Sequence, residues 1–240
     1  MIAVALGFVV KFFWMEILYL DDKLMVANKP AGLPVLPDGW EPDAPYLVKM
    51  LEEQFGKIWI VHRLDKITSG AMVFARTADA HRDLSLQFER HEARKLYHAI
   101  LNGVPKWDEK TARHPLRVNV GHRHRTMVND KNGKPAETSF KVLERHAAYT
   151  LIEAQLMTGR THQIRVHAYA LGFPLLGDAL YSAPETELIA RPALHAYSLS
   201  LRLRPAADTS SSNIESLLKT FSAPYPPDFK HALEQIRASS

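Results

Sequence analysis

The chain of 240 residues contains no cysteine. This absence excludes disulfide bonds, thiolate nucleophiles and metal sites with cysteine ligands, and it suits the reducing cytoplasm. Histidine is plentiful but poorly spaced for a metal. His162 and His167 are five residues apart, about 140° around a helix, so they would not share a face. The sequence therefore predicts a cytoplasmic protein that uses neither a metal nor another cofactor.

Long apolar runs are also scarce. The strongest one, MIAVALGFVVKFFW at 1–14, is interrupted by Lys11 and followed by Glu16, well short of the roughly 20 apolar residues that cross a membrane. No basic segment precedes it and no small-residue cleavage site follows it, unlike a signal peptide. We treat 1–14 as a separate N-terminal extension, predict Met15 as the natural start, and expect no membrane contact. The alternative is a short strand or helix packed on the body.

Basic residues are present in modest excess, with a net charge of +4, and they are unevenly distributed. Residues 113–145 hold eight Lys or Arg against three acidic residues, and Arg123 and Arg125 stand among histidines in GHRHRTM. Such a run is either a solvated loop or a patch that contacts phosphates. Composition alone leaves both interpretations open.

The apolar pattern predicts an α+β fold with a mainly antiparallel sheet. No internal repeat or low-complexity region divides the chain, and we expect one domain in two halves over 15–240. The expected strands lie at 17–20, 23–28, 58–62, 70–76, 95–103, 137–146, 149–157 and 193–205, and the expected helices at 46–55, 78–91, 161–171 and 228–239. Irregular segments are expected at 28–45 and 173–185, and a polar linker at 207–213.

A polar cluster follows one predicted strand. In GKIWIVHRLDKITSG, His62, Arg63 and Asp65 come at the end of an apolar run. A solvated salt-bridge corner and an active-site carboxylate would both give this pattern. The cluster alone does not distinguish between them.

The predicted helix 161–171 has two unlike faces. Ile164 and Ala168 belong to an apolar stripe, while His162, Arg165 and Tyr169 fall within about 60° of one another on nearly the opposite side. These polar residues are either a solvent-facing stripe or, because apolar segments flank the helix, part of an enclosed site. The preceding TGRT offers backbone amides at the helix N-terminus, where a phosphate or carboxylate could bind.

Tyr97 lies in KLYHAILNG, whose alternation puts Tyr97, Ala99 and Leu101 on one face of a strand. Most tyrosines in such strands are core residues with a satisfied hydroxyl. Local pattern therefore favours a packing role for Tyr97.

Several segments, taken in order, resemble the successive motifs of the RluA family of RNA pseudouridine synthases. They are NKPAGLPV at 28–35, HRLDKITSG at 62–70, KLYHAILNG at 95–103 and TGRTHQIRVHAYALGFPLLGDALY at 158–181. RPALHAYSLSLRLRP and FSAPYPPDF resemble the C-terminal signatures, so the likeness covers roughly residues 17–229. It implies a mixed, mostly antiparallel sheet in two halves around a basic cleft, and conversion of specific uridines in ribosomal or transfer RNA to pseudouridine.

The resemblance also implies roles for single residues. Asp65 matches the catalytic aspartate, Tyr97 the tyrosine that packs on the target base, and Arg165 the arginine that pairs with the aspartate. Residues 15–240 would be one catalytic domain without the N-terminal RNA-binding domain of many relatives. We therefore expect a compact RNA stem-loop as partner and no obligate protein partner.

The chemistry is an isomerisation, which explains how a chain without cofactor motifs could perform it. The target base must be flipped out of its stack, and one carboxylate must act as nucleophile or as base. We expect the Arg165 guanidinium to keep Asp65 ionised in a partly dry pocket. The residues expected to contact RNA or the base are His62, Arg63, Arg123, Arg125, Arg160 and His162.

Alternatives remain for single residues and for the whole chain. Arg63 could instead form a surface salt bridge, and His62 is expected to orient or pack rather than act as a base. The chain could be a non-catalytic RNA-binding protein on the same scaffold. A hydrolase that combines Asp65 with His162 or His167 is remote, because no nucleophile elbow or metal motif is present. Loops at 36–45 and 113–127 are expected to select the RNA.

Overall fold

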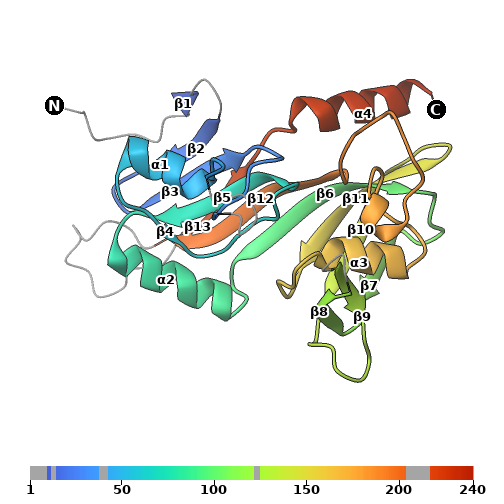
Figure 1. Cartoon of the computed structure of the whole chain (residues 1–240), viewed down its shortest axis with the longest axis horizontal. Helices are drawn as coiled ribbons and strands as arrows, with labels where there is room; N and C mark the ends of the chain where they lie inside the picture. The colour runs from blue at the N-terminus through green and yellow to red at the C-terminus, as the bar shows by residue number, and fades with distance from the viewer. Residues whose placement is uncertain (1–9, 12–14, 38–42, 122–124, 204–216, 240) are drawn as a thin grey trace.

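The computed structural model describes residues 10–11, 15–37, 43–121, 125–203 and 217–239. Within this part of the chain, eleven strands form one sheet, and a separate hairpin projects from it (Figure 1). The strands are β1 (Val10–Lys11), β2 (Glu16–Leu20), β3 (Leu24–Lys29), β4 (Trp59–Ile60), β5 (Ser69–Ala75), β6 (Arg94–Asn102), β7 (Glu109–Ala112), β8 (Leu116–Val120), β9 (Arg125–Val128), β10 (Thr138–Arg145), β11 (Tyr149–Leu156), β12 (Leu194–Leu203) and β13 (Leu217–Ser222).

The large sheet has the order β1-β2-β3-β5-β12-β6-β11-β10-β7, with β4 beside β5 and β13 beside β12, while β8 and β9 make the hairpin. Its one parallel pairing among the described strands joins β5 to β12. At this junction Gly70 has φ +120°, and a Cβ there would lie 2.2 Å from the Ala196 carbonyl oxygen, so only glycine lets the two strands meet. The expected α+β class with a mostly antiparallel sheet is confirmed.

In the described ranges, four α-helices and one 3-10 helix flank the sheet: α1 (Leu47–Phe55), α2 (Ala78–Glu89), α3 (Gln163–Ala170), α4 (Pro227–Ala238) and η1 (Ala179–Tyr181). Local signals set their ends. The Thr77 hydroxyl accepts a hydrogen bond from the Ala80 N–H at the start of α2. Gly56, at φ 77°, ends α1. These boundaries agree with the expected ones.

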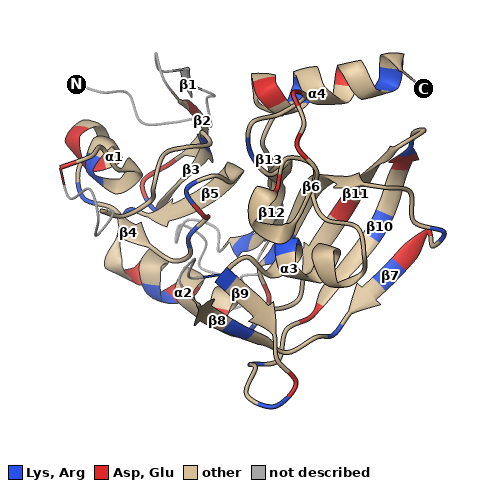
Figure 2. Ribbon diagram, turned by 45° about the vertical axis from the view of Figure 1, so that its right-hand side comes forward, with Lys and Arg blue, Asp and Glu red and all other residues tan. Residues whose placement is uncertain are grey.

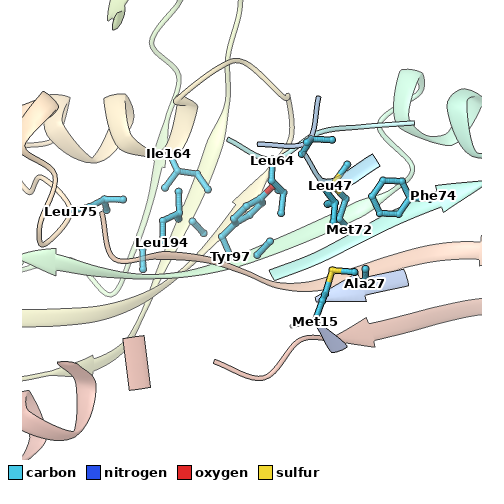
Figure 3. Close-up of a cluster of buried hydrophobic side chains, with 14 of the residues drawn as sticks. Met15, Ala27, Leu47, Leu64, Met72, Phe74, Tyr97, Ile164, Leu175 and Leu194 are labelled. Carbon is cyan, nitrogen blue, oxygen red and sulfur yellow. The ribbon is translucent and has the colours of Figure 1, made fainter. Parts of the chain in front are cut away.

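Strand β6 separates two parts of the core, as its alternation predicts. Tyr97, Ala99 and Leu101 are buried in the main cluster, which also contains Ile164 of α3 (Figure 3). Ile100 faces the other way and packs against α4. The predicted facing of Tyr97 is therefore confirmed, and Tyr97 lies on the same side of the sheet as α3.

The strand expected at 58–62 is wrong in extent: only Trp59 and Ile60 pair with β5. The reason is that the Nε2 atom of His62 accepts a hydrogen bond, 3.1 Å long, from the Val73 backbone N–H. The ring thus occupies a donor of β5 that a longer β4 could have used. The chain leaves the sheet at this point and carries Asp65 into a loop.

Helix α3 begins at Gln163, two residues later than expected, because His162 has a left-handed backbone with φ 55°. At the N-terminus, β1 pairs with Glu16 and Ile17 of β2. The proposed start at Met15 stays a prediction. The predicted linker at 207–213 lies outside the described residues.

Candidate active site

A cavity of about 430 Å³ opens between the loop 61–68, β6, the end of α2 and the start of α3. Five side chains predicted to act together with Asp65 line it. They are His62, Arg63, Tyr97, Arg160 and His162. Segments far apart along the chain thus meet at one site, as the motifs implied.

The loop that carries Asp65 is anchored on both sides. The Thr68 N–H donates to the Asp65 carbonyl oxygen at 3.0 Å, and Leu64 is buried in the main core. The Lys66 carbonyl oxygen accepts from the Gly32 N–H at 2.8 Å and from the Lys29 ammonium at 3.2 Å. These contacts hold the backbone around Asp65 while leaving its carboxylate at the cavity.

Lys29 is fully buried at the end of β3. Its ammonium donates to three carbonyl oxygens, those of Pro30, Leu33 and Lys66. Burial lowers its pKa to about 7, and the positive charge of Arg191 adds to this effect, while the charge of Asp65 opposes it. Lys29 therefore ties the NKPAGLPV segment to the Asp65 loop.

The Asp65 carboxylate is about 30% exposed, and the nearest ionisable partner in the described chain is the His162 Nε2 atom, 3.9 Å from Oδ2. That separation is too long for a hydrogen bond. The carboxylate is therefore open to solvent and to a ligand in the cavity.

The expected pairing of Arg165 with Asp65 is wrong in this structure. Arg165 donates from Nε and Nη2 to the two carboxylate oxygens of Asp178, at 2.6 and 2.7 Å. Both side chains are buried, with 3% and 0% exposure. A guanidinium can satisfy one carboxylate with such a fork, and Asp178, enclosed within the protein, needs that partner far more than the solvated Asp65 does.

His162 lies between the two carboxylates and its tautomer follows from its neighbours. The Tyr181 hydroxyl accepts from the Thr126 N–H at 3.1 Å and donates to the Thr126 carbonyl oxygen at 3.0 Å. Its single proton is thereby used, because a buried carbonyl left without a donor is costly. The His162 Nδ1 atom, 3.1 Å from the same hydroxyl, must then be the donor.

Neutral His162 therefore presents an unprotonated Nε2 toward Asp65. Burial lowers the pKa of His162, the charge of Arg165 lowers it further, and Asp65 and Asp178 oppose the shift. Two proton acceptors, one nitrogen and one carboxylate oxygen, thus face the same part of the cavity. The arrangement can bind an O–H or N–H group, or receive a proton.

Tyr97 presents its ring to the cavity beside Leu64, Ile164 and Leu194 (Figure 3). Burial raises the pKa of its hydroxyl, and the nearby charge of Asp65 raises it further. The tyrosine therefore keeps its proton at physiological pH. Its apolar ring and protonated hydroxyl can stack on a base and donate a hydrogen bond.

Arg63, Lys95 and Arg160 are among the residues that line the cavity, and basic residues mark α2, β8, β9 and α3 (Figure 2). Arg63 is exposed, and within the described ranges it has neither a hydrogen bond nor an ion-pair partner. Arg160 lines the cavity and donates to the Pro135 carbonyl oxygen. Arg125 lines a different groove, and Arg123 lies outside the described residues.

His62 is a packing residue in this structure. Its ring stacks on Phe88 of α2 at 4.5 Å between centroids, and Nε2 is occupied by Val73. Burial lowers its pKa to about 3, with a further contribution from Lys95. Its neutral, hydrogen-bonded ring fits the expected orienting role.

Sequence reasoning missed several residues of the site. Lys95 lines the cavity, and burial lowers its pKa. Asp178 and Tyr181 hold Arg165 and His162, and both stand in the GDALY segment that had no assigned role. The GDALY motif could have pointed to these two residues. The sequence does not show that they contact Arg165 and His162, because those contacts depend on how η1 packs beside α3.

Metal centres and membrane-spanning helices are both absent from the described part of the chain. No group of three or more histidine or acidic side chains there is assembled in a way that could hold a metal ion. No helix in the described ranges has the length and apolar character needed to cross a membrane.

Comparisons with known proteins agree with the motifs. The model of a family described as RNA pseudouridylate synthase matches residues 23–170. Ribosomal large subunit pseudouridine synthase D of Neisseria meningitidis (serogroup A) is 38% identical over 97% of this chain and 64% of its own length. Dual-specificity RNA pseudouridine synthase RluA of Escherichia coli K12 is 40% identical over 78% of this chain and 87% of its own.

Solved structures include a similar fold. Human RNA pseudouridylate synthase domain containing 4 superimposes with a TM-score of 0.72 and 27% identity, covering 92% of each chain. The present chain spans slightly less than two thirds of the Neisseria relative.

Proposed function

Because the chain belongs to the RNA pseudouridylate synthase family, we propose that it converts specific uridines of structured RNA to pseudouridine, with Asp65 as the catalytic carboxylate. The observation that carries the proposal is the partly exposed Asp65 carboxylate, which faces a cavity with Tyr97 on one wall and cations in its lining. A solvated salt-bridge corner would give Asp65 a close basic partner, and within the described residues none lies within hydrogen-bond distance.

The reaction would proceed without a cofactor. The bond between uracil N1 and ribose C1′ breaks, the base turns, and a bond from uracil C5 to C1′ forms. The proton on C5 is then lost, and N1 carries a proton in the product, so no electrons are gained or lost. Asp65 acts either as the nucleophile or as the base that removes a sugar proton.

The residues around Asp65 would divide the remaining tasks. Tyr97 stacks on the flipped uracil, which offsets part of the cost of a few kcal/mol of unstacking. The His162 Nε2 atom, an acceptor beside Asp65, is placed to receive a proton or to accept a hydrogen bond from the substrate. Arg165, paired with Asp178 rather than with Asp65, would hold the Tyr181 ring and through it the hydroxyl that contacts His162.

Arg63, Arg160 and Lys95 would bind the RNA backbone. Each lines the cavity, and cations at such a surface neutralise phosphates and release counterions. Arg63 is adjacent to the loop position that the target base must approach, so it would fill the space that the flipped base leaves in the stack.

The RNA target is proposed from the relatives. The Neisseria relative is named for the ribosomal large subunit, and the Escherichia coli relative is described as dual-specificity. We propose a stem-loop of ribosomal RNA as the first substrate to test, with transfer RNA as the second.

The test is release of tritium from RNA labelled at uracil C5. Wild type should release tritium, whereas Asp65→Asn should bind RNA and release none. Asp79→Asn, which changes a 91% exposed aspartate of α2, is the matched control and should react as wild type. Binding of RNA without tritium release by wild type would instead support a non-catalytic RNA-binding protein, and release by Asp65→Asn at the normal rate would remove Asp65 from the mechanism.

A further inference from the structure

A second, smaller groove lies between strand β9 and helix α3. It has a volume of about 210 Å³, about half that of the cavity at Asp65. Its lining is mostly apolar and aromatic, and includes Arg125, Met127, Val128, Val166, Tyr169 and Tyr181. The groove thus has room for a planar ring but not for a large folded element.

Two large apolar or aromatic side chains of the groove are exposed. Tyr169 is 45% exposed and Met127 is 36% exposed. The ring of Tyr169 lies 6.1 Å from that of Tyr181 at an angle of 45° between their planes. Two aromatic rings, one exposed and one buried, therefore flank an opening to solvent.

The charged side chain that lines the groove is basic. Arg125 belongs to its lining, and Arg117 is the register partner of Met127 on the neighbouring strand β8. No carboxylate is among the described residues that line it. An apolar slot beside guanidinium groups suits an aromatic ring attached to a phosphate chain.

The groove shares a wall with the cavity at Asp65. Tyr181 lines the groove, and its hydroxyl lies 3.1 Å from the Nδ1 atom of His162, which lines the cavity. The rings of Tyr181 and His162 are 5.9 Å apart between centroids. An RNA strand that places one base at Asp65 can therefore bring a nearby base to the groove.

We propose that this groove binds one unstacked nucleobase of the substrate RNA, close in sequence to the uridine at Asp65, by stacking on Tyr169. The inference rests on the proposed function and names a second base-binding site beside it. Such a site would help to hold the loop open and would contribute to the choice of RNA. Base readout by stacking tolerates different bases, so the site selects an unpaired nucleotide at the correct spacing.

The test measures RNA affinity in the Asp65→Asn background, so that no turnover occurs. The probe is the shortest ribosomal RNA hairpin that wild type converts. Tyr169→Ala should raise Kd roughly 5- to 150-fold, the range that one base–aromatic stack covers. Tyr169→Phe should stay within about twofold, because the ring is retained. Leu218→Ala, at a 63% exposed apolar residue of β13, is the control and should not change Kd.

A second arm identifies the occupant. Nucleotides on either side of the target uridine are replaced one at a time by abasic residues. For one of these abasic RNAs, the Kd should be the same with Asp65→Asn alone and with Asp65→Asn plus Tyr169→Ala. This RNA lacks the base that would stack on Tyr169. Equal weakening of every RNA, abasic ones included, would overturn the proposal, as would an unchanged Kd for Tyr169→Ala.

Two other outcomes are separable. If wild type converts no RNA, the proposed function fails and this inference fails with it. If sedimentation shows a dimer that Tyr169→Ala dissociates, the groove binds a second copy of the chain and the base-binding proposal is overturned. If wild type converts the RNA and Tyr169→Ala leaves Kd unchanged, the base-binding proposal is overturned while the proposed function stands.

Discussion

The loop around Asp65 and the segment around Asp178 both bring a carboxylate to helix α3, and they treat it in opposite ways. Asp178 is fully buried and receives two short hydrogen bonds from Arg165. Asp65 is about 30% exposed, and its nearest ionisable neighbour, His162, is 3.9 Å away. The protein itself supplies the hydrogen-bond donors for Asp178. The Asp65 carboxylate remains accessible to solvent and to a ligand.

The two carboxylates therefore suit different roles: Asp178 a structural one and Asp65 a chemical one. A buried, forked ion pair joins α3 to the segment before η1, and its fully enclosed carboxylate is out of reach of a ligand. A carboxylate held by its backbone alone can change partners during a reaction. Tyr181 connects the two regions, because its ring lies under Arg165 and its hydroxyl contacts His162.

The largest expected difference is in stability. Asp178→Asn should lower the free energy of unfolding by about 3–5 kcal/mol, since it leaves the Arg165 charge buried without a counterion. Asp65→Asn should change it by less than about 0.5 kcal/mol, because that side chain is partly solvated. Urea denaturation of both variants measures this. The double change Arg165→Met with Asp178→Leu should recover much of the loss, and equal destabilisation by the two single Asn variants would contradict the comparison.

Lys29 allows a pH-dependent test of the comparison. Its ammonium contacts the Asp65 loop through the Lys66 carbonyl oxygen, whereas it has no hydrogen bond to the Asp178 segment among the described residues. Its pKa of about 7 in the folded protein lies below the ordinary value of 10.5. Between these values the unfolded chain binds more protons, so the contribution of Lys29 to stability rises with pH, by at most about 1.4 kcal/mol per unit. Below pH 7 both states carry the proton, and this contribution is flat.

Lys29→Met should remove that rise and weaken the loop by about 1–3 kcal/mol, because three carbonyl oxygens lose their donor. Urea denaturation of wild type and variant at pH 7, 8 and 9 isolates the difference. Other titrating groups are common to both proteins and cancel. Parallel stability profiles would show that Lys29 is not the group responsible.

Tyr181→Phe tests the connection between the two regions. The ring under Arg165 remains, but the hydroxyl and its two hydrogen bonds to Thr126 are lost. The hydrogen bond that orients His162, worth about 0.5–1.5 kcal/mol, is lost with them. We expect kcat to fall roughly 2- to 12-fold with little change in KM. Tyr225→Phe, which removes a hydroxyl paired with His98, is the control and should leave kcat unchanged. A fall in kcat of the same size for both variants would indicate a general loss of packing.

Much of this arrangement was predictable from sequence where local pattern decides it. The alternation in β6 predicted the facing of Tyr97, and the ordered motifs predicted that Asp65, Tyr97 and Arg165 share a site. Asp65 and Tyr97 do line one cavity, whereas Arg165 pairs with Asp178. The partner of Arg165 was not predictable from spacing, because Asp65 and Asp178 are both acids near α3 in the fold, and burial decides between them. The early end of β4 was missed for a similar reason: a His62 ring takes the place of a main-chain acceptor.

The smallest effect is expected for Arg63, a cation in the Asp65 loop, in comparison with Arg165, the cation of α3 that pairs with Asp178. Arg165 is buried in its ion pair, whereas Arg63 is exposed at the cavity. Arg63→Ala should therefore reduce the slope of log K against log salt for RNA binding by about 1, as loss of one phosphate contact does. Stability should change by less than about 0.5 kcal/mol. Lys230→Ala, at an exposed site of α4, should leave the salt slope intact; an equal reduction there would mean that Arg63 acts only through net charge.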